Sequence, residues 1–247
     1  MTEYPGLTPA HLPINPKVET AQRFVAAAYD SVAEFVIWHE TALRLAEDMA
    51  EEETVENRDL AALTSNYSSD LLRSMIVFGT AGLDAALKQL IRDCLPTVLN
   101  ISSKACDRFV KFTEREIDSD RSAGKKNLAQ ILTSADPRRA LIDRYVTDLR
   151  GSSLQSVGQV QNVAEALGIE DQNLRRRITQ LRPSFDARNE IVHELDLLGP
   201  ATHGDKQRRL RSLDQAIRLS HESLDVAQQI VNAVAVLLPS HRDRTGE

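Results

Sequence analysis

The sequence predicts an all-α fold, an antiparallel helical bundle with two long central helices and several short helices inserted before the helix that carries the main motif. The apolar residues are mostly Leu, Ala, Val and Ile, and aromatic residues make up only 4% of the chain, which favours helix-on-helix packing over a β-sandwich. Apolar residues also recur at helical spacing over long stretches without Pro or Gly. With 247 residues, of which 42% are hydrophobic, the chain can bury one sizeable core or two small ones.

The N-terminal region divides into an arm and a helix. Residues 1–16 should form an extended arm, because helix is blocked by four prolines, Pro5, Pro9, Pro13 and Pro16. A long helix is predicted over 18–49, where Pro and Gly are absent and apolar residues recur at helical spacing. The acidic run at 51–53 indicates a helix end or a linker. We therefore expect the N-terminal helix with its acidic end to occupy 17–60.

A second long helix is predicted over 69–95, opened by capping residues at 68–70 and closed by Pro96. It is apolar on nearly all sides, as expected for a central helix. Asp84 falls in one of its apolar sectors. Since buried carboxylates are rarely unpaired, Asp84 should have a partner.

Shorter helices should follow, with Gly168 and Pro183 ending two of them. The predicted ranges are 103–117, 125–134, 137–149, 156–167 and 171–182. The motif helix is expected over 184–198, capped by Ser184 and ended by Gly199 and Pro200, and a last long helix over 206–238. Residues 61–240 would then form one helical domain, or 17–240 one compact unit, with a tail at 241–247.

Composition limits the compartment and the chemistry. The two cysteines, Cys94 and Cys106, give no metal-ligand or disulfide pattern, and with no secretory signal they predict a reducing, cytoplasmic location. The longest strongly apolar run, 230–238, is too short for a bilayer, so no membrane role is expected. Since no Walker A, GxGxxG, HExxH or paired CxxC pattern is present, we expect no cofactor and no metal.

Charge is distributed unevenly along the chain. Residues 1–60 carry four basic residues against twelve carboxylates, whereas residues 121–218 carry 17 basic against 12 acidic residues. A basic C-terminal half permits a nucleic-acid partner without requiring one. Charge runs on helices are most often solvated surface. The runs concerned are Lys125-Lys126, Arg138-Arg139, Arg175-Arg176-Arg177 and Arg208-Arg209.

The stretch "FDARNEIVHEL" at 185–195 places a charge on an apolar helix face. On a helical wheel Arg188 lies within about 40° of Val192 and Leu195, in the middle of the apolar arc. Asn189 and His193 share one edge of that arc, one turn apart. The solvent side carries Glu190 and Glu194. A guanidinium on a packing face needs an anion, either a buried carboxylate such as Asp84 or a phosphate held beside the imidazole and the amide.

These residues resemble a known motif. "RNEIVH" at 188–193 is similar to the arginine, polar residue, three residues, histidine signature of the HEPN superfamily of helical ribonucleases and toxins. "VFGTAGLDAALKQLIRDCL" resembles the long central helix of these domains, which often carries an acidic residue near Asp84. "ARNEIVHELDLLGP", followed by a polar loop and a last long helix, resembles the RiboL-PSP-HEPN branch. The resemblance covers roughly residues 65–240.

The resemblance implies a metal-independent endoribonuclease whose motif residues from two protomers meet at a dimer cleft. His193 would move protons, Arg188 would stabilise charge on the phosphorane-like transition state, and Asn189 would orient the phosphate or the imidazole. Cleavage would give a 2′,3′-cyclic phosphate or 3′-phosphate and a 5′-hydroxyl, so DNA would not be cut. Toxin–antitoxin or phage-defence biology is implied, with an antitoxin or defence protein as partner. Arginines that could flank an RNA cleft are Arg175, Arg176, Arg177 and Arg182.

Three other interpretations stay open. The segment 163–178 has the spacing of a helix-turn-helix with an arginine-rich second helix, which would read duplex DNA. A HEPN-like module could instead bind RNA, a nucleotide or a protein without catalysis. Finally, the chain could be a helical scaffold in which Arg188 pairs with Asp84 and His193 joins a hydrogen-bond chain.

Overall fold

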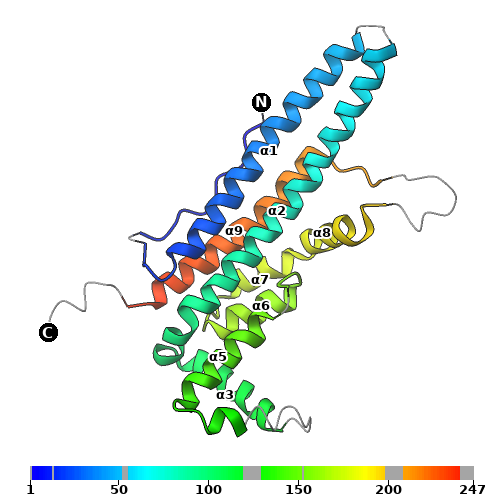
Figure 1. Cartoon of the computed structure of the whole chain (residues 1–247). Coiled ribbons are helices and arrows are strands. Elements are labelled where there is room, and N and C mark those ends of the chain that lie inside the picture. Colours follow the sequence, from blue (N-terminus) through cyan, green and yellow to red (C-terminus); the bar gives the residue numbers. More distant parts are fainter. Residues whose placement is uncertain are drawn as a thin grey trace. The chain divides into compact units, whose positions relative to one another are not determined.

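The computed structural model describes residues 2–12, 14–51, 55–118, 129–151, 153–197 and 208–239. Within these ranges the regular structure is helical and no strand occurs, apart from one isolated antiparallel bridge between Leu197 and Arg208. The predicted all-α fold is therefore confirmed. The helices, labelled in Figure 1, are α1 (Glu19–Glu51), α2 (Val55–Ile101), α3 (Ser103–Asp118), α5 (Pro137–Arg150), α6 (Val157–Ala166), α7 (Gln172–Gln180), α8 (Arg182–Glu194) and α9 (Leu213–Leu237).

The chain forms two compact units, neither of them continuous in sequence. Helices α1, α2, α7 and α9 each contribute residues to both units. The first unit comprises Met1–Pro9, Arg23–Leu83 and Thr179–Gln228, and the second comprises Ala10–Gln22, Asp84–Ile178 and Gln229–Glu247.

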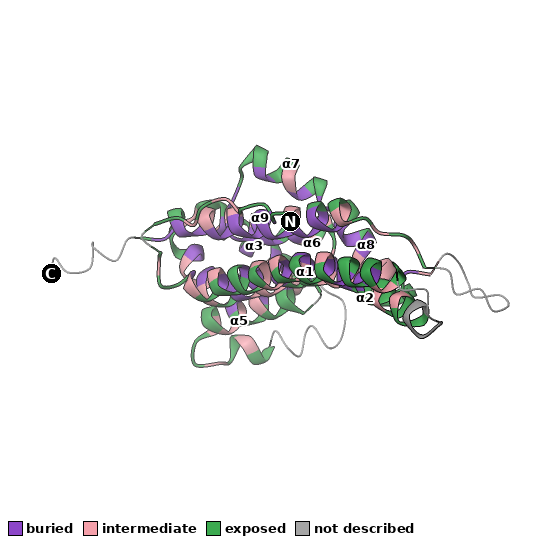
Figure 2. Ribbon diagram, turned by 90° about the horizontal axis from the view of Figure 1, so that it is seen from above, coloured by how far each residue is buried: buried purple, intermediate pink, exposed green. Residues whose placement is uncertain are grey.

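The core of the first unit is built from one face of α1, α2, α8 and α9, and α9 is buried over most of its length (Figure 2). Burial of these apolar side chains is the main favourable term for this unit. The arm joins the core through Tyr4, whose hydroxyl donates to Ser220 Oγ at 3.1 Å. The cluster consists of Tyr4, Val32, Val36, Leu72, Met75, Ile76, Ala187, Ala216, Ile217, Leu219 and Leu224.

Two glycines let the helices of the first unit approach closely. A Cβ on Gly82 would lie 2.5 Å from Ala28 Cβ and 2.7 Å from a methyl of Leu224. A Cβ on Gly79 would lie 2.7 Å from Ser220 Cα. Both glycines are on α2, so this helix meets α1 and α9 at a separation that no larger residue permits.

The second unit packs α3 against α5 and α6. Tyr145 of α5 contacts the rings of Phe109 and Phe112 on α3, with centroids 5.6 and 4.6 Å apart. Gly168 follows α6 with φ of +74°, the left-handed conformation that ends a helix. A side chain there would also meet Ser102 Oγ at 2.5 Å, so both backbone and space require glycine.

The boundaries predicted for α2 were wrong at both ends. The helix runs from Val55 through Pro96 to Ile101. Buried Leu95 and Val98 hold the chain on either side of the proline, so packing outweighs its lost hydrogen bond. The expected caps lie inside the helix, where Ser69 Oγ bonds to the carbonyl of Ser65 at 3.1 Å.

The bounds predicted for the motif helix α8 were also wrong. It begins at Arg182, so that α7 ends at Gln180, and Pro183 lies in its first turn, where a missing N–H costs nothing. Ser184 is not its cap: it is buried and its hydroxyl donates to the carbonyl of Leu219 at 3.1 Å. The helix ends at Glu194, before the predicted position 198, because Leu195 and Asp196 adopt φ of 53° and 59°.

Two other predicted helices differ in extent. The last helix begins at Leu213, and residues 208–212 before it are not helical. Of the short helix expected over 125–134, residues 129–132 are helical. Residues 125–128, the expected helix stop at Gly199 and Pro200, and the tail at 241–247 lie outside the described residues.

Candidate functional site

The three motif residues lie together at the C-terminal half of α8. Arg188 Nη1 donates to Asn189 Oδ1 at 3.1 Å and lies 3.2 Å from His193 Nε2. Because a guanidinium has only donors, a hydrogen bond here requires His193 Nε2 to accept, in the tautomer whose proton is on Nδ1. Arg188 and Asn189 are half-buried, while His193 is exposed. The motif therefore presents an imidazole lone pair and a guanidinium at an accessible edge.

Arg188 is less buried than the helical wheel predicts. The buried residues of α8 are in its first half, at Ser184, Phe185 and Ala187. Toward the end of the helix Ile191 still packs against the core, but Val192 is 41% exposed and Leu195, just after the helix, is 64% exposed. A wheel gives directions but not where the core ends, which explains the error.

Asp84 has partners of its own in the second unit. Its carboxylate accepts a hydrogen bond from the Leu154 backbone N–H at 2.7 Å and lies 3.0 Å from Lys88 Nζ. The Asp84 carboxylate thus holds the backbone at Leu154, before α6, and its charge is balanced by Lys88, one turn further along α2. Its charge is accounted for without Arg188, so these contacts give no support to the Arg188–Asp84 pair.

A buried ion cluster that the sequence did not indicate lies just after the motif. Asp196 is fully buried, with Oδ1 2.6 Å from Arg211 Nη2 and Oδ2 2.9 Å from Arg73 Nε. Burial alone would raise the pKa of Asp196, but hydrogen bonds and charges from Arg211 and Arg73 outweigh it and hold the pKa below its ordinary value. Arg211 Nη2 also reaches Glu190 Oε2 at 2.7 Å. The Arg211 guanidinium therefore binds two carboxylates of the motif region, those of Glu190 and Asp196.

The cluster extends into a network of alternating charges. Asp70 lies 2.7 Å from Arg208 and 3.1 Å from Arg73, and Arg209 lies 3.7 Å from Glu190. Glu190, expected on the solvent side, is half-buried here, whereas Glu194 is exposed as predicted. The basic run at 208–209 is thus matched by carboxylates of its own unit. The Asp196 network comprises Arg208, Asp70, Arg73, Asp196, Arg211, Glu190, Arg209 and Glu194.

The four arginines suggested for RNA binding are divided between the two units. Arg175, Arg176 and Arg177 belong to the second unit and Arg182 to the first. Arg177 is half-buried and the other three are exposed. Arg175 is ion-paired with Glu165 of its own unit at 3.6 Å.

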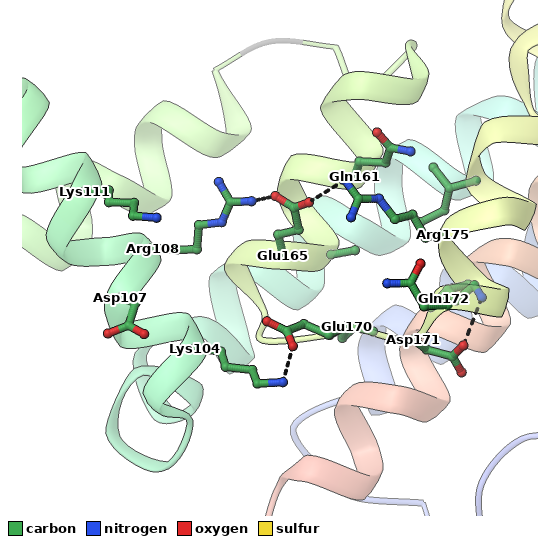
Figure 3. Close-up of a pocket in the computed structure, with 14 residues that line it drawn as sticks. Lys104, Asp107, Arg108, Lys111, Gln161, Glu165, Glu170, Asp171, Gln172 and Arg175 are labelled. Carbon is green, nitrogen blue, oxygen red and sulfur yellow. Dashed lines mark hydrogen bonds and ion pairs between the residues drawn. The ribbon is translucent and has the colours of Figure 1, made fainter.

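Arg175 borders a groove of about 390 Å³ formed by α3, α6 and α7 (Figure 3). Glu165 lies between Arg108 and Arg175 and is ion-paired with both, and Lys104 pairs with Glu170. The groove therefore mixes both signs of charge instead of offering a positive track for a polyanion.

The helix-turn-helix interpretation concerns α6 and α7, which are joined by the short connection 167–171. Gly168 turns the chain, and Asp171 caps α7 by accepting from the N–H groups of Asn173 and Leu174 at 2.7 and 3.2 Å. The outer face of α7 is polar. Its exposed residues are Gln172, Asn173, Arg175, Arg176, Thr179 and Gln180.

Comparisons of the chain with protein-family models, with curated proteins and with solved structures find no match. Among the described residues, no group of three or more His, Cys, Asp or Glu side chains is arranged to hold a metal ion. None of the helices in the described ranges combines the length and apolarity needed to cross a membrane.

Proposed function

We propose that this protein is an endoribonuclease of the HEPN type that cleaves RNA without a metal at a cleft shared by two copies of the chain. The observation that carries the proposal is the contact of Arg188 Nη1 with Asn189 Oδ1 and His193 Nε2 at an exposed helix edge. A guanidinium held by two neutral groups is free to exchange them for a phosphate, which binds it more strongly.

The chemistry follows from these three groups. When a scissile phosphate takes the guanidinium, His193 Nε2 is released to accept the proton of the ribose 2′-hydroxyl. The 2′-oxygen then attacks phosphorus while Arg188 stabilises the charge on the equatorial oxygens. The leaving 5′-oxygen takes a proton from the histidine of the second protomer, which enters the step as an imidazolium and leaves it neutral. The products are a 2′,3′-cyclic phosphate and a 5′-hydroxyl.

A homodimer is supported by the apolar side chains around the motif. Val192 on α8 and Leu195 just after it are exposed, and Phe78 of α2 is exposed beside a groove that it forms with Ile191 and Leu195. Exposed apolar side chains grouped beside a polar site are typical of a protein interface. A second copy packed on this face would bring two His193 imidazoles together. The cysteine usage of the sequence favours a cytoplasmic location, and the family resemblance favours a toxin or phage-defence effector with an antitoxin or defence protein as partner.

Cleavage of RNA in EDTA tests the proposal. Purified wild-type protein should convert a 5′-labelled RNA to fragments ending in a 2′,3′-cyclic phosphate and leave the matching DNA intact. His193→Ala and Arg188→Ala should abolish cleavage. Suitable controls are His221→Ala, which removes another histidine of the same unit, and Arg218→Ala, which removes an exposed arginine. Equal cleavage by His193→Ala and wild type would refute the proposal.

Duplex DNA binding is a second candidate function, favoured by the exposed polar face of α7. Gln, Asn and Arg side chains are the groups that read base edges in the major groove. Retarded migration of a duplex selected from a random pool, lost in Gln172→Ala/Arg176→Ala, would support it. The HEPN-like module that binds without catalysis would show RNA retention with no cleavage.

A further inference from the structure

Two carboxylates that flank His193 in sequence are held from outside the helix. Glu190, three residues before it, bonds to Arg211 at 2.7 Å, and Asp196, three residues after it, bonds to Arg211 at 2.6 Å and to Arg73 at 2.9 Å. Arg211 precedes α9 and Arg73 lies on α2. The last turn of α8 is thereby tied to two other parts of its unit.

The backbone stops the helix immediately after the motif. Leu195 and Asp196 both adopt positive φ, and both of their N–H groups reach the carbonyl of Glu190. Neither residue is glycine, so this conformation is strained. Such strain persists only where the surroundings impose it. The surroundings here are the bonds of Arg211 and Arg73 to the Asp196 carboxylate and the bond from the Arg209 N–H to the Asp196 carbonyl at 2.7 Å.

Stability alone is a poor explanation for the buried charges. Apolar residues of similar volume generally stabilise a core as well as a buried ion pair does, because desolvation offsets the attraction between the charges. What a fully bonded ionic cluster provides better is a fixed geometry, since each guanidinium must point at its carboxylates. The geometry fixed here is that of the turn carrying His193.

We propose that Asp196, held by Arg211 and Arg73, is a positioning residue that sets the orientation of the His193 imidazole toward Arg188. The catalytic role of this orientation rests on the proposed function. The orientation of the His193 imidazole itself can be measured without activity. Asp196 is fully buried, so it would act on His193 without a contact to RNA. Its effect passes through the left-handed pair 195–196 and through the Arg211–Glu190 bond to the turn where Nη1 and Nε2 lie 3.2 Å apart.

The test uses ¹⁵N-histidine-labelled protein, whose imidazole nitrogen shifts report which ring nitrogen carries the proton. In the wild type at pH 8, His193 should favour the form with an unprotonated Nε2, which accepts from Arg188. Asp196→Asn keeps the size of the side chain and tolerates positive φ but removes the charge. Glu190→Gln, at a half-buried position, is a second variant that should fold if the first does not. Each should lower the preference for this form by about threefold or more, the scale of one lost hydrogen bond.

The matched control is Ser184→Ala, which removes a buried hydrogen bond at the other end of α8. Circular dichroism and thermal unfolding establish that each variant is folded at the temperature of measurement. In RNA cleavage, Asp196→Asn and Glu190→Gln should lower kcat by about 10- to 100-fold with little change in KM, as expected for a misplaced catalytic group. Ser184→Ala should change neither the tautomer nor kcat.

The outcomes separate this inference from the proposed function. If wild type cleaves no RNA but the tautomer shifts in both variants, the positioning role stands and the ribonuclease proposal fails. If wild type cleaves RNA and a folded Asp196→Asn or Glu190→Gln keeps both the tautomer and kcat of wild type, the positioning role is overturned. A tautomer shift of the same size in Ser184→Ala would also overturn it.

Discussion

Arg188 Nη1 lies 3.2 Å from His193 Nε2, and the other group it contacts, Asn189 Oδ1, is also neutral. Within the described part of the chain no carboxylate is bonded to this guanidinium. Removing it should therefore leave no buried charge uncompensated. We expect Arg188→Ala to change the free energy of unfolding by less than about 1 kcal/mol while abolishing RNA cleavage. Urea denaturation and the EDTA cleavage assay measure the two effects.

Arg211 differs from Arg188, because its replacement by alanine removes an ion-pair partner of the fully buried Asp196 carboxylate. Arg211→Ala should destabilise the protein by about 3 to 5 kcal/mol, the usual cost of breaking a buried ion pair from one side. A large loss of stability in Arg188→Ala, equal to that in Arg211→Ala, would instead mean that Arg188 is a structural residue.

The lowered pKa of Asp196 predicts how stability depends on pH. Burial opposes ionisation, but Arg211 and Arg73 keep this carboxylate charged in the folded state more readily than in the unfolded chain. Its contribution to stability is therefore complete above the ordinary pKa of about 3.9. That contribution is lost as the pH falls through the lower folded pKa, when the unfolded state binds the proton first. Urea unfolding between pH 6 and pH 3 should show this decline.

Asp196→Asn is the comparison for that experiment. It should be less stable than wild type at pH 6, and the difference between the two proteins should shrink as the pH falls toward 3. A difference that stays constant over this range would show that the ionisation of Asp196 does not contribute.

The motif was predictable because its geometry is local. Arg188, Asn189 and His193 lie on one helix, so spacing alone places them on adjoining faces. Asp196, Arg73 and Arg211 are far apart in the sequence, and no periodicity relates them. The early end of α8 was missed because Leu195 and Asp196 give no sign of positive φ, whereas Gly199 and Pro200 give a conventional helix stop.

The predicted helix boundaries were wrong where tertiary packing outweighs the local conformational preference of the sequence. Pro96 should end a helix, yet buried Leu95 and Val98 keep α2 helical through it. Ser184 has the identity of a cap but serves as a buried donor to α9. In each case the deciding partner lies far away in sequence.

Gly82 offers a test of the helix contacts in the first unit. Alanine favours helix by up to about 1 kcal/mol over glycine, but its methyl group would lie 2.5 Å from Ala28 Cβ and 2.7 Å from Leu224. We expect the cost of overpacking to exceed the gain in helix preference, so that Gly82→Ala destabilises the protein by about 1 to 3 kcal/mol. A methyl group on Gly158 of α6 would meet no atom within 4 Å, so Gly158→Ala should stabilise by about 0.4 to 1 kcal/mol. Chemical denaturation should show that the two substitutions change the free energy of unfolding in opposite directions. Changes in the same direction would contradict the close approach of the helices.

The two cysteines should differ in reactivity. Burial, aided by the charge of Asp93, raises the pKa of the Cys94 thiol to about 12, so the reactive thiolate is scarce at pH 8. Cys106 is only half-buried. With a disulfide reagent at pH 8, native protein should release one equivalent of thiolate quickly and the second at least about 100-fold more slowly. Cys106→Ser should remove the fast phase, and its persistence would place the reactive thiol at Cys94.

The exposed side chain of Leu195 separates dimerisation from folding. It is 64% exposed, so Leu195→Glu should leave the stability of the single chain within about 0.5 kcal/mol of wild type. A charge in the centre of an apolar interface would prevent association, and light scattering at micromolar concentration should show monomers in place of dimers. RNA cleavage should fall with the dimer population, because each cleft needs groups from two chains. Leu210→Glu is the matched control, since Leu210 is 98% exposed and lies off the motif helix; it should remain dimeric and active. A wild-type protein that is monomeric and fully active would exclude the composite cleft.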